Sequence, residues 1–354
     1  MEAPLKTGIL GLDEPGRFLL EATRGLDYFK IVAVADSDPN LAQQFGKLWN
    51  CAFYDDYRQL ITQNQLDCLF VAAPLHTCAE YLKMALKKKF NIFKLPPFAR
   101  NYSEASELAK LAQTEGVTFT VANLNRFARP ALAMRNSILQ NPDEQFFFIL
   151  AGAGRKKGSG PILSDSANSQ QGKWRSDPVL SGGGVLLYDC WETIDQIVWN
   201  FGIPQQIYCL AGNTTPDRQQ RLYLTENSAV VTMKFSNTLS ACLLAGRAAG
   251  TPDKGPQKWL IARSQNTLLK FDDKTFEVTD SQGQCLRKDE FSDDTLARVK
   301  KTLECFGSNL LSPDQNVPFC TAADNLKNMA VIEAAYLSAR TGVPEEPARI
   351  LQIA

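Results

Sequence analysis

The sequence predicts an α/β protein with a doubly wound parallel sheet, followed by an α+β domain with an open, mostly antiparallel sheet. Up to residue 122, short apolar runs alternate with segments of helical periodicity, whereas later strand-like runs follow one another directly. The length of 354 residues also favours two domains over one. We place them at residues 1–125 and 126–354.

A strand–helix–strand unit between residues 68 and 97 organises the first domain. The runs CLFVAAP and NIF have the apolar character of buried parallel strands. Between them, apolar or small side chains recur at helical spacing, at Cys78, Tyr81, Leu82, Ala85 and Leu86. Ligands of open α/β sheets lie at the carboxyl ends of the strands. The residues expected at such a site are 73–76 and 95–97.

A glycine turn follows the first predicted strand, at residues 6–10. The turn reads GLDEPG and precedes a helix from about Arg17, which is the context of a dinucleotide-binding fingerprint. The second strand, residues 30–35, ends at Asp36, where a carboxylate can accept hydrogen bonds from an adenosine ribose. The candidate cofactor-binding residues are therefore Gly11, Leu12, Asp13, Gly16, Asp36, Ala73, Pro74 and His76.

Asp13 stands where the fingerprint has its middle glycine. Two like charges about 4 Å apart cost about 4 kcal/mol at an effective dielectric of about 20, so Asp13 disfavours a pyrophosphate. Alternatively, Asp13 only caps the helix, with Pro15 in its first turn. Either NAD or NADP is a candidate cofactor, and Asp36 favours NAD because its charge repels a 2′-phosphate.

The remaining elements follow the two-domain pattern. In the first domain we expect helices at about 41–49 and 103–115 and a strand at 118–121. In the second we expect a helix over 126–140, a helix over 185–201 and a long loop over 152–173. The strands expected there are 146–150, 206–210, 222–224, 230–235, 240–245, 259–262 and 268–271.

Composition excludes several classes of function. The 38 basic and 38 acidic residues balance, so neither a nucleic acid nor a membrane surface is an expected partner. No apolar run approaches the roughly 20 residues that span a bilayer. Nine scattered cysteines without CxxC pairs, and the lack of an export signal, predict free thiols in the cytoplasm. With one histidine, no metal site is expected.

Several motifs in order along the chain resemble the glucose-fructose oxidoreductase/inositol dehydrogenase family (Gfo/Idh/MocA). They are GILGLDEPG, VAVADSDPNLAQQFG, FVAAPLHTCAEYLKMALKKKFNIFKLPPFA, GKWRSDP, SGGGVLL and EAAYLSARTGVP. The resemblance implies an NAD(P)-binding Rossmann-like domain and a C-terminal substrate domain. It also implies a sugar- or cyclic polyol-like ligand, and a homo-oligomer that buries the free face of the second sheet.

Compared with this family, the chain departs at the catalytic positions. The family's Glu-Lys-Pro corresponds here to Leu95, Pro96 and Pro97, and proline cannot transfer a proton. Lys94 either substitutes from two residues away or is structural. Cys78 stands where the family often has histidine, and His76 is either a base near the site or a bystander.

A second chemical locus begins with three glycines at residues 182–184. On the helix expected after them, Tyr188, Glu192 and Asp195 share one face. The resemblance places the family's aspartate and histidine at Tyr188 and Glu192 and keeps an aspartate at Asp195. Tyr188 and Glu192 transfer protons if burial raises the carboxyl pKa; alternatively, they only hydrogen-bond each other or line a vestigial cleft. Trp174 and Arg175 match the family's loop, where Arg175 either binds ligand or holds the loop.

The sequence thus indicates an NAD(P)-dependent oxidoreductase of the Gfo/Idh/MocA type with degenerate glycine-turn and catalytic motifs. Ordinary dehydrogenase activity is expected to be weak or absent. Tyr188 and Glu192 are the catalytic candidates, and Trp174, Arg175 and Asp195 the substrate candidates. The alternative is a non-catalytic pseudoenzyme that binds a metabolite or a protein on the same fold.

Overall fold

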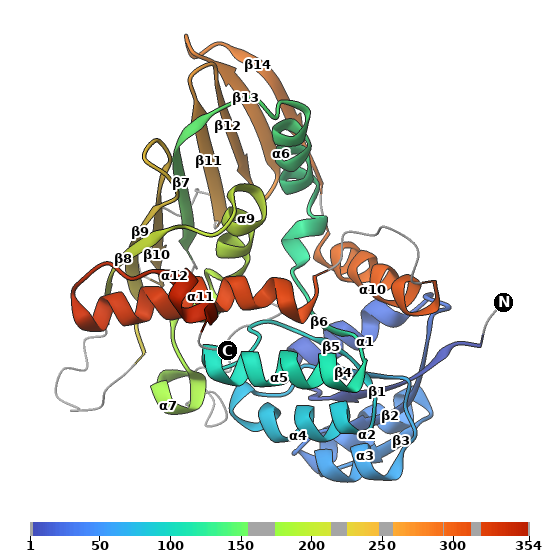
Figure 1. The fold of residues 1–354 in the computed structure, drawn as a ribbon. Coiled ribbons are helices and arrows are strands. Elements are labelled where there is room, and N and C mark those ends of the chain that lie inside the picture. Colours follow the sequence, from blue (N-terminus) through green and yellow to red (C-terminus); the bar gives the residue numbers. More distant parts are fainter. Residues whose placement is uncertain are drawn as a thin grey trace. The chain divides into compact units, whose positions relative to one another are not determined.

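The computed structural model describes residues 3–154, 174–213, 225–247, 258–292, 294–312 and 320–352 (Figure 1). The chain forms two compact units. The first contains the residues up to Ala122 and also Thr295–Asn325. The domain limits expected from the sequence placed all of 126–354 in the second part, so the segment from Thr295 to Asn325 departs from that expectation.

The first unit has a parallel sheet of six strands in the order β3-β2-β1-β4-β5-β6. The strands are β1 (Leu5–Leu10), β2 (Phe29–Ala35), β3 (Ala52–Tyr54), β4 (Cys68–Val71), β5 (Asn91–Lys94) and β6 (Phe119–Val121). The helices are α1 (Glu14–Thr23), α2 (Pro39–Trp49), α3 (Tyr57–Gln63), α4 (Leu75–Lys87), α5 (Tyr102–Glu115) and α10 (Thr295–Leu311). This confirms the doubly wound parallel sheet, whose order reverses between β1 and β4.

Aromatic packing explains why α10 belongs to the first unit. The Phe306 ring lies 5.4 Å from the Phe93 ring and 6.2 Å from the Phe29 ring, centroid to centroid. A Cβ added at Gly307 would lie 2.8 Å from the Tyr28 side chain, so the helix approaches closely here. Burial of such rings stabilises the fold by several kcal/mol. It therefore places α10 in the first unit, although this helix follows most of the second unit in the sequence.

The second unit has an eight-stranded sheet in the order β14-β13-β12-β11-β7-β10-β9-β8, antiparallel except between β7 and β10. The strands are β7 (Phe146–Gly154), β8 (Gln206–Gly212), β9 (Ser228–Lys234), β10 (Ser240–Gly246), β11 (Lys258–Ser264), β12 (Thr267–Asp272), β13 (Thr275–Asp280) and β14 (Cys285–Glu290). The helical elements are η1 (Leu124–Phe127), α6 (Arg129–Gln140), α7 (Pro178–Ser181), α8 (Val185–Tyr188), α9 (Trp191–Phe201), α11 (Ala322–Thr341, in this unit from residue 326) and α12 (Pro347–Gln352).

The mostly antiparallel sheet is confirmed, with local differences. Residues 152–154 of the expected loop belong to β7, while its remainder and the expected strand at 222–224 lie outside the described residues. Strands β13 and β14 were not predicted, because the alternation in TFEVTD is limited to Phe276 and Val278 and CLRKDE is mostly charged.

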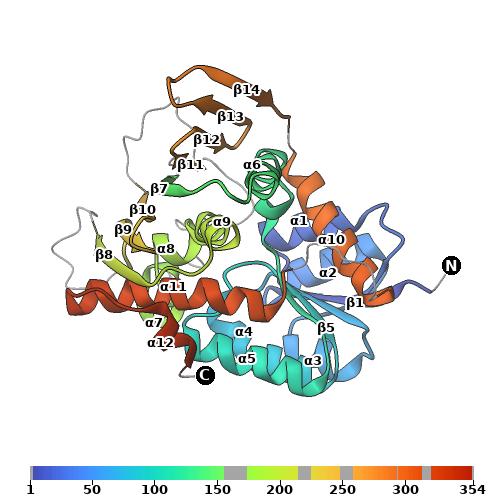
Figure 2. The ribbon, with the colours of Figure 1, turned by 45° about the horizontal axis from the view of Figure 1, so that its top comes forward.

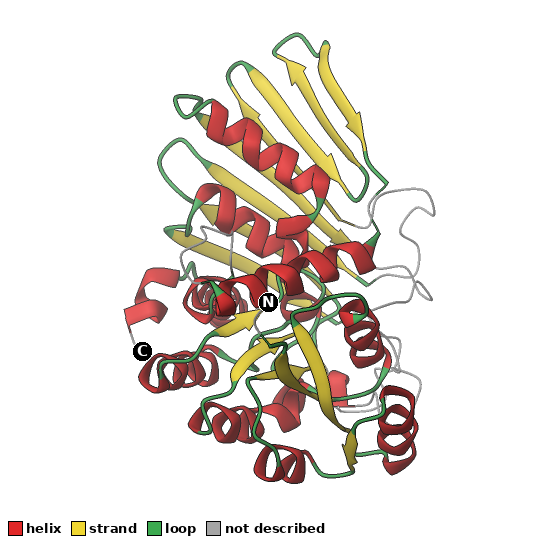
Figure 3. Ribbon diagram, turned by 90° about the vertical axis from the view of Figure 1, so that its right-hand side faces the viewer, coloured by secondary structure: helices red, strands yellow, loops and turns green. Residues whose placement is uncertain are grey.

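Helices cover one face of this sheet (Figures 2 and 3). Helix α6 packs against β12 and β13, and α9 against β7 and β11. On the other face, Leu210, Val230 and Leu244 lie in register on three neighbouring strands and are 59%, 41% and 45% exposed. Part of the second sheet therefore presents apolar side chains to solvent.

None of the helices in the described ranges has the length and apolar character that crossing a bilayer requires. All nine cysteines are free thiols.

Candidate functional site

The glycine turn after β1 is held by its own packing. Gly11 has φ +89°, and a Cβ there would lie 2.5 Å from the Ala73 amide nitrogen. A Cβ at Gly16 would overlap the Gly11 carbonyl oxygen. Both positions therefore require glycine, which keeps β1, the turn and α1 in the compact geometry used for dinucleotides.

Asp36 ties this turn to the end of β2. Its Oδ2 accepts the Leu12 N–H at 2.6 Å and its Oδ1 accepts the Asp38 N–H at 2.9 Å. The side chain is only 7% exposed. Asp36 thus lies at the expected edge of the sheet, but both of its oxygens already accept a hydrogen bond from the backbone.

Asp13 occupies the N-cap position, because α1 begins at Glu14 rather than near Arg17. Its side chain makes no capping hydrogen bond, so the capping interpretation is wrong for the carboxylate. Pro15 lies in the first turn as predicted. The exposed side chains of Asp13 and Glu14 place two carboxylates at a helix N-terminus that would otherwise favour a phosphate.

Lys94, at the end of β5, is structural in this geometry. Its ammonium donates to the carbonyl oxygens of Leu95 at 3.0 Å and Pro97 at 2.6 Å, and the residue is 3% exposed. Burial lowers the pKa of Lys94, while Cys78 and Glu104 raise it. The ammonium holds the backbone around Pro96 from inside instead of taking the place of the missing lysine.

Ala73 and Pro74 directly precede α4, and Cys78 and His76 lie in its first turns. The Cys78 thiol contacts the Ala73 and Pro74 carbonyl oxygens, each at 3.1 Å, and burial raises its pKa to about 11. This thiol is therefore neutral near pH 7. The half-buried His76 lies at the carboxyl edge of the sheet, as expected.

The single histidine offers a clean pH measurement. Burial, and secondarily the charge of Arg100, lower the pKa of His76 from its ordinary value of 6.5. The unfolded chain then binds more protons, so the His76 contribution to the free energy of unfolding falls as pH decreases from 6.5 through the folded pKa. In a proton NMR titration, we expect a folded pKa below that of the same protein in urea. An equal or higher folded value would contradict the burial of this ring.

The helix expected over 185–201 is two helices, α8 and α9, separated at Asp189 and Cys190. Tyr188 and Glu192 consequently do not share one continuous helical face, which corrects that expectation. The Tyr188 hydroxyl donates to the Ser181 carbonyl oxygen at 2.9 Å. Its ring lies 6.2 Å from the Trp174 ring.

Arg175 completes an aromatic–cation cluster with these two rings. Its guanidinium carbon lies 5.3 Å from the Trp174 ring centroid and 5.7 Å from the Tyr188 ring centroid. All three side chains are half-buried. The structure therefore brings together three of the candidate residues, in an arrangement that offers an apolar face and polar groups to a hydroxylated ligand.

Glu192 makes its hydrogen bonds outside this aromatic–cation cluster. Its carboxylate accepts the N–H groups of Leu124 at 3.0 Å and Asn125 at 2.9 Å, at the start of η1. The residue is 6% exposed. Burial raises the pKa of Glu192, opposed mainly by the charge of Lys258. The raised pKa meets one condition for proton transfer, but the visible role of the carboxylate is to cap η1.

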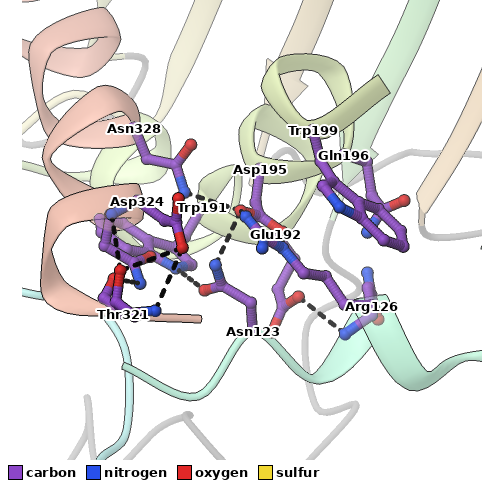
Figure 4. Close-up of polar contacts among 12 residues, drawn as sticks. Asn123, Arg126, Trp191, Glu192, Asp195, Gln196, Trp199, Thr321, Asp324 and Asn328 are labelled. Carbon is purple, nitrogen blue, oxygen red and sulfur yellow. Dashed lines mark hydrogen bonds and ion pairs between the residues drawn. The ribbon is translucent and has the colours of Figure 1, made fainter. Parts of the chain in front are cut away.

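Asp195 is the centre of a buried network (Figure 4). Its carboxylate accepts hydrogen bonds from Asn123 at 2.7 Å, from Arg126 at 2.9 and 2.7 Å, and from Asn328 at 2.8 Å. The Trp191 indole N–H donates to the Asn123 side-chain oxygen at 2.7 Å. Asp195 is 0% exposed, so its bonding is that of a structural ion pair. Asn123, Arg126 and Asn328 were not predicted.

The triglycine turn before α8 is explained by Glu226, another residue that the sequence did not indicate. Glu226 accepts hydrogen bonds from the Gly184 N–H at 2.9 Å, the Leu186 N–H at 3.0 Å and the Tyr336 hydroxyl at 2.8 Å. Cβ atoms at Gly183 and Gly184 would overlap the Tyr336 hydroxyl and the Glu226 backbone oxygen. No local sequence pattern indicates these contacts, because Glu226 and Tyr336 lie 42 and 152 residues from Gly184.

In the described part of the chain, no group of three or more His, Cys, Asp or Glu side chains is placed to hold a metal ion.

Comparison with known proteins finds one family model that matches the first part of the chain and solved structures that resemble it in fold. Residues 5–123 match the model of a family described as "Oxidoreductase family, NAD-binding Rossmann fold". A Bacillus subtilis protein called uncharacterized oxidoreductase YrbE is 25% identical over 142 residues, which are 40% of this chain and 41% of that protein. The match thus spans about two fifths of the length of this curated relative.

Two solved structures resemble nearly the whole chain in fold. An inositol dehydrogenase homologue from Azotobacter vinelandii, complexed with NAD+, has a TM-score of 0.86 at 15% identity and covers 98% of both chains. Levoglucosan dehydrogenase, in complex with NADH and levoglucosan, has a TM-score of 0.82 at 15% identity. It covers 97% of this chain and 99% of its own. At these identities the likeness concerns the fold.

Proposed function

We propose that the chain is an oxidoreductase of the Gfo/Idh/MocA type, whose NAD-binding Rossmann model matches residues 5–123, and that it binds a nicotinamide dinucleotide and a sugar- or polyol-like molecule. Its ordinary dehydrogenase activity is weak or absent. Nucleotide binding is supported above all by the glycine turn. There Gly11 packs against the backbone of Ala73, Gly16 packs against Gly11, and Asp36 holds the turn through a hydrogen bond.

The residues of the first unit fit the cofactor in shape and oppose it in charge. Gly11, Leu12, Asp13 and Gly16 would hold the pyrophosphate, while Asp36 would face the ribose and favour NAD over NADP. Ala73, Pro74 and His76 would border the cofactor at the next strand. When bound, the nicotinamide supplies hydride chemistry. The carboxylates of Asp13 and Glu14 weaken binding through repulsion of the phosphates.

Weak activity follows from the groups that replace the acid/base set. Pro96 has no titratable group, and the Lys94 ammonium is engaged by the Leu95 and Pro97 carbonyl oxygens. Positioned acid/base groups contribute about 10²–10⁴-fold to rate. Glu192 has the raised pKa of a proton donor, but both of its oxygens cap η1. Tyr188 therefore stands as the remaining catalytic candidate, with Glu192 as its partner only if that cap opens.

The substrate candidates differ in their support. Trp174 and Arg175 lie in the aromatic–cation cluster with Tyr188, which suits the apolar face and hydroxyls of a sugar. Asp195 is fully buried within its hydrogen-bond network, so it would support the site without touching the ligand.

A non-catalytic role as a metabolite- or protein-binding pseudoenzyme is the second candidate. The hydrogen bonds of both Glu192 oxygens with Leu124 and Asn125 favour it, because they hold the carboxylate on the backbone of η1.

We also propose that a second copy of the chain covers the exposed row Leu210–Val230–Leu244. An apolar row in register on three strands supports a self-complementary interface. Sedimentation equilibrium would show a dimer mass, and a monomer at micromolar concentration would contradict the interface.

The nine free thiols support a reducing compartment, the cytoplasm, as the location of the protein.

Calorimetric titration of the cofactor-free protein with NADH and NADPH tests the cofactor proposal. We expect NADH to bind more tightly than NADPH, because Asp36 repels the 2′-phosphate. Preference for NADPH would contradict the role of Asp36. Absence of binding of either nucleotide would favour the non-catalytic candidate.

A further inference from the structure

Helix α9 buries polar side chains of two kinds. Glu192 and Asp195 accept hydrogen bonds from neighbouring backbone or side-chain groups. Thr193 and Gln196 are 4% and 1% exposed, yet within the described ranges no group bonds the Thr193 hydroxyl or either polar atom of the Gln196 amide. The buried side-chain oxygen of Asn200 is in the same situation. Buried polar atoms of this kind are satisfied in nearly all native proteins, so these four atoms require partners.

The three residues form one stripe along α9. Thr193, Gln196 and Asn200 are separated by three and four positions, which is the spacing of neighbours on one face of a helix. A rise of about 1.5 Å per residue puts about 4.5 Å between the first two along the axis and about 6 Å between the last two. The Asn200 Nδ2 is engaged within the helix, where it donates to the Gln196 carbonyl oxygen at 2.8 Å. The four polar atoms therefore lie along one side of α9.

The strands under α9 present aliphatic side chains to it. Helix α9 packs against β7 and β11. On these strands Ala151 pairs with Leu260 and Ile149 with Ala262, and all four side chains are fully buried. Aliphatic side chains neither donate nor accept a hydrogen bond, and an alanine leaves more space against a helix than a leucine or an isoleucine does. This face of the sheet therefore adds space rather than hydrogen-bond partners.

We propose that ordered water molecules, about two of them, are built into the second unit beside the stripe of Thr193, Gln196 and Asn200. One water bridges the Thr193 hydroxyl and the Gln196 amide, and the other bridges this amide and the Asn200 side-chain oxygen. A buried water makes about three hydrogen bonds, so two waters suffice for the four atoms. With bonds of about 2.8 Å on either side, a water spans about 5.6 Å, which is close to the spacing along the stripe.

Water fits this stripe better than an ion does. All three side chains are neutral, and the Gln196 amide offers donors as well as an acceptor. A cation would meet the amide N–H groups, and an anion would meet the side-chain oxygens, whereas water both donates and accepts. The inference stands apart from the proposed function, since it requires neither a nicotinamide nucleotide nor a sugar-like ligand.

A crystal structure of the native full chain, at a resolution that reveals ordered water, tests the proposal directly. We expect a water within about 3.2 Å of the Gln196 amide that also lies within hydrogen-bond distance of Thr193 or Asn200. Magnetic relaxation dispersion of the water oxygen counts long-lived buried waters in solution. There, Gln196→Met should lose at least one such water, because methionine has nearly the same length and no amide. Gln44→Met, at an exposed position of α2, is the matched control and should leave the count unchanged.

Thermal unfolding separates a hydrated stripe from a dry one. If waters satisfy the amide, Gln196→Met removes hydrogen bonds, and Tm falls or stays within about 2 °C. If the amide is buried dry, the same change removes an unsatisfied group, and Tm rises by more than that. Such a rise, an unchanged water count in Gln196→Met, or a crystal structure without water at the amide would each overturn the proposal. If Gln196→Met fails to fold, the crystal structure of the native chain still decides.

Discussion

Replacement of Asp195 by alanine is expected to lower the free energy of unfolding by about 3–5 kcal/mol. Asp195 is fully buried and is the counter-ion of Arg126, at 2.7 and 2.9 Å. Its removal leaves a guanidinium in the core and deprives the amides of Asn123 and Asn328 of their acceptor. A buried charge without a partner costs more than the pair contributes, so the loss exceeds that of an ordinary hydrogen bond.

Urea denaturation followed by tryptophan fluorescence measures this change. The matched control is Glu346→Gln, which breaks an exposed pair with Arg349 and should change stability by less than about 1 kcal/mol. If Asp195→Ala fails to fold, Asp195→Asn, which keeps one acceptor, should be intermediate. A loss below about 1 kcal/mol for Asp195→Ala would mean that the network does not stabilise the second unit.

Replacement of Asp13 by glycine is expected to tighten NADH binding about 10- to 100-fold, which corresponds to about 1.4–2.7 kcal/mol. The change restores the middle glycine between Gly11 and Gly16 and removes one carboxylate from the phosphate path. The Coulomb cost at contact is about 4 kcal/mol at an effective dielectric of about 20, and solvent around the exposed side chain reduces it. The fold should tolerate the change, because the side chain makes no capping hydrogen bond.

Calorimetric titration of native and variant protein measures the gain, and it should shrink at high salt because the repulsion is screened. Glu21→Gln, at the far end of α1, is the matched control and should leave NADH affinity unchanged. Equal binding by native protein and Asp13→Gly would show that the Asp13 carboxylate turns away from the nucleotide.

Much of the fold could be predicted because its signals are local. The buried strand β4 and the periodic helix α4 carry their patterns within a dozen residues. Strand β3 and helix α3 were missed because one has three residues and the other seven. The place of α10 was missed for a different reason. It depends on the contact of Phe306 with Phe29 and Phe93, which are more than 200 residues away in sequence.

The site was less predictable than the fold because its bonds are long-range. The cluster of Trp174, Arg175 and Tyr188 joins residues within fifteen positions, and the motif order indicated all three. The partners of Asp195 and Glu192 lie 67 to 133 residues away. Helical spacing placed Tyr188 and Glu192 on one helix, whereas Tyr188 ends α8 and Glu192 lies in the first turn of α9. Periodicity describes a helix only where the helix is continuous.

The packing of the first turn has a consequence for how this chain changes over time. Gly11 and Gly16 are required by contacts with the protein's own backbone, whether or not a nucleotide is bound. Purifying selection for folding alone would preserve both glycines after loss of cofactor use. Asp13 is exposed, and its side chain makes no capping hydrogen bond to α1. In homologues of this chain, we therefore expect the residue at position 13 to indicate whether the nucleotide is still used.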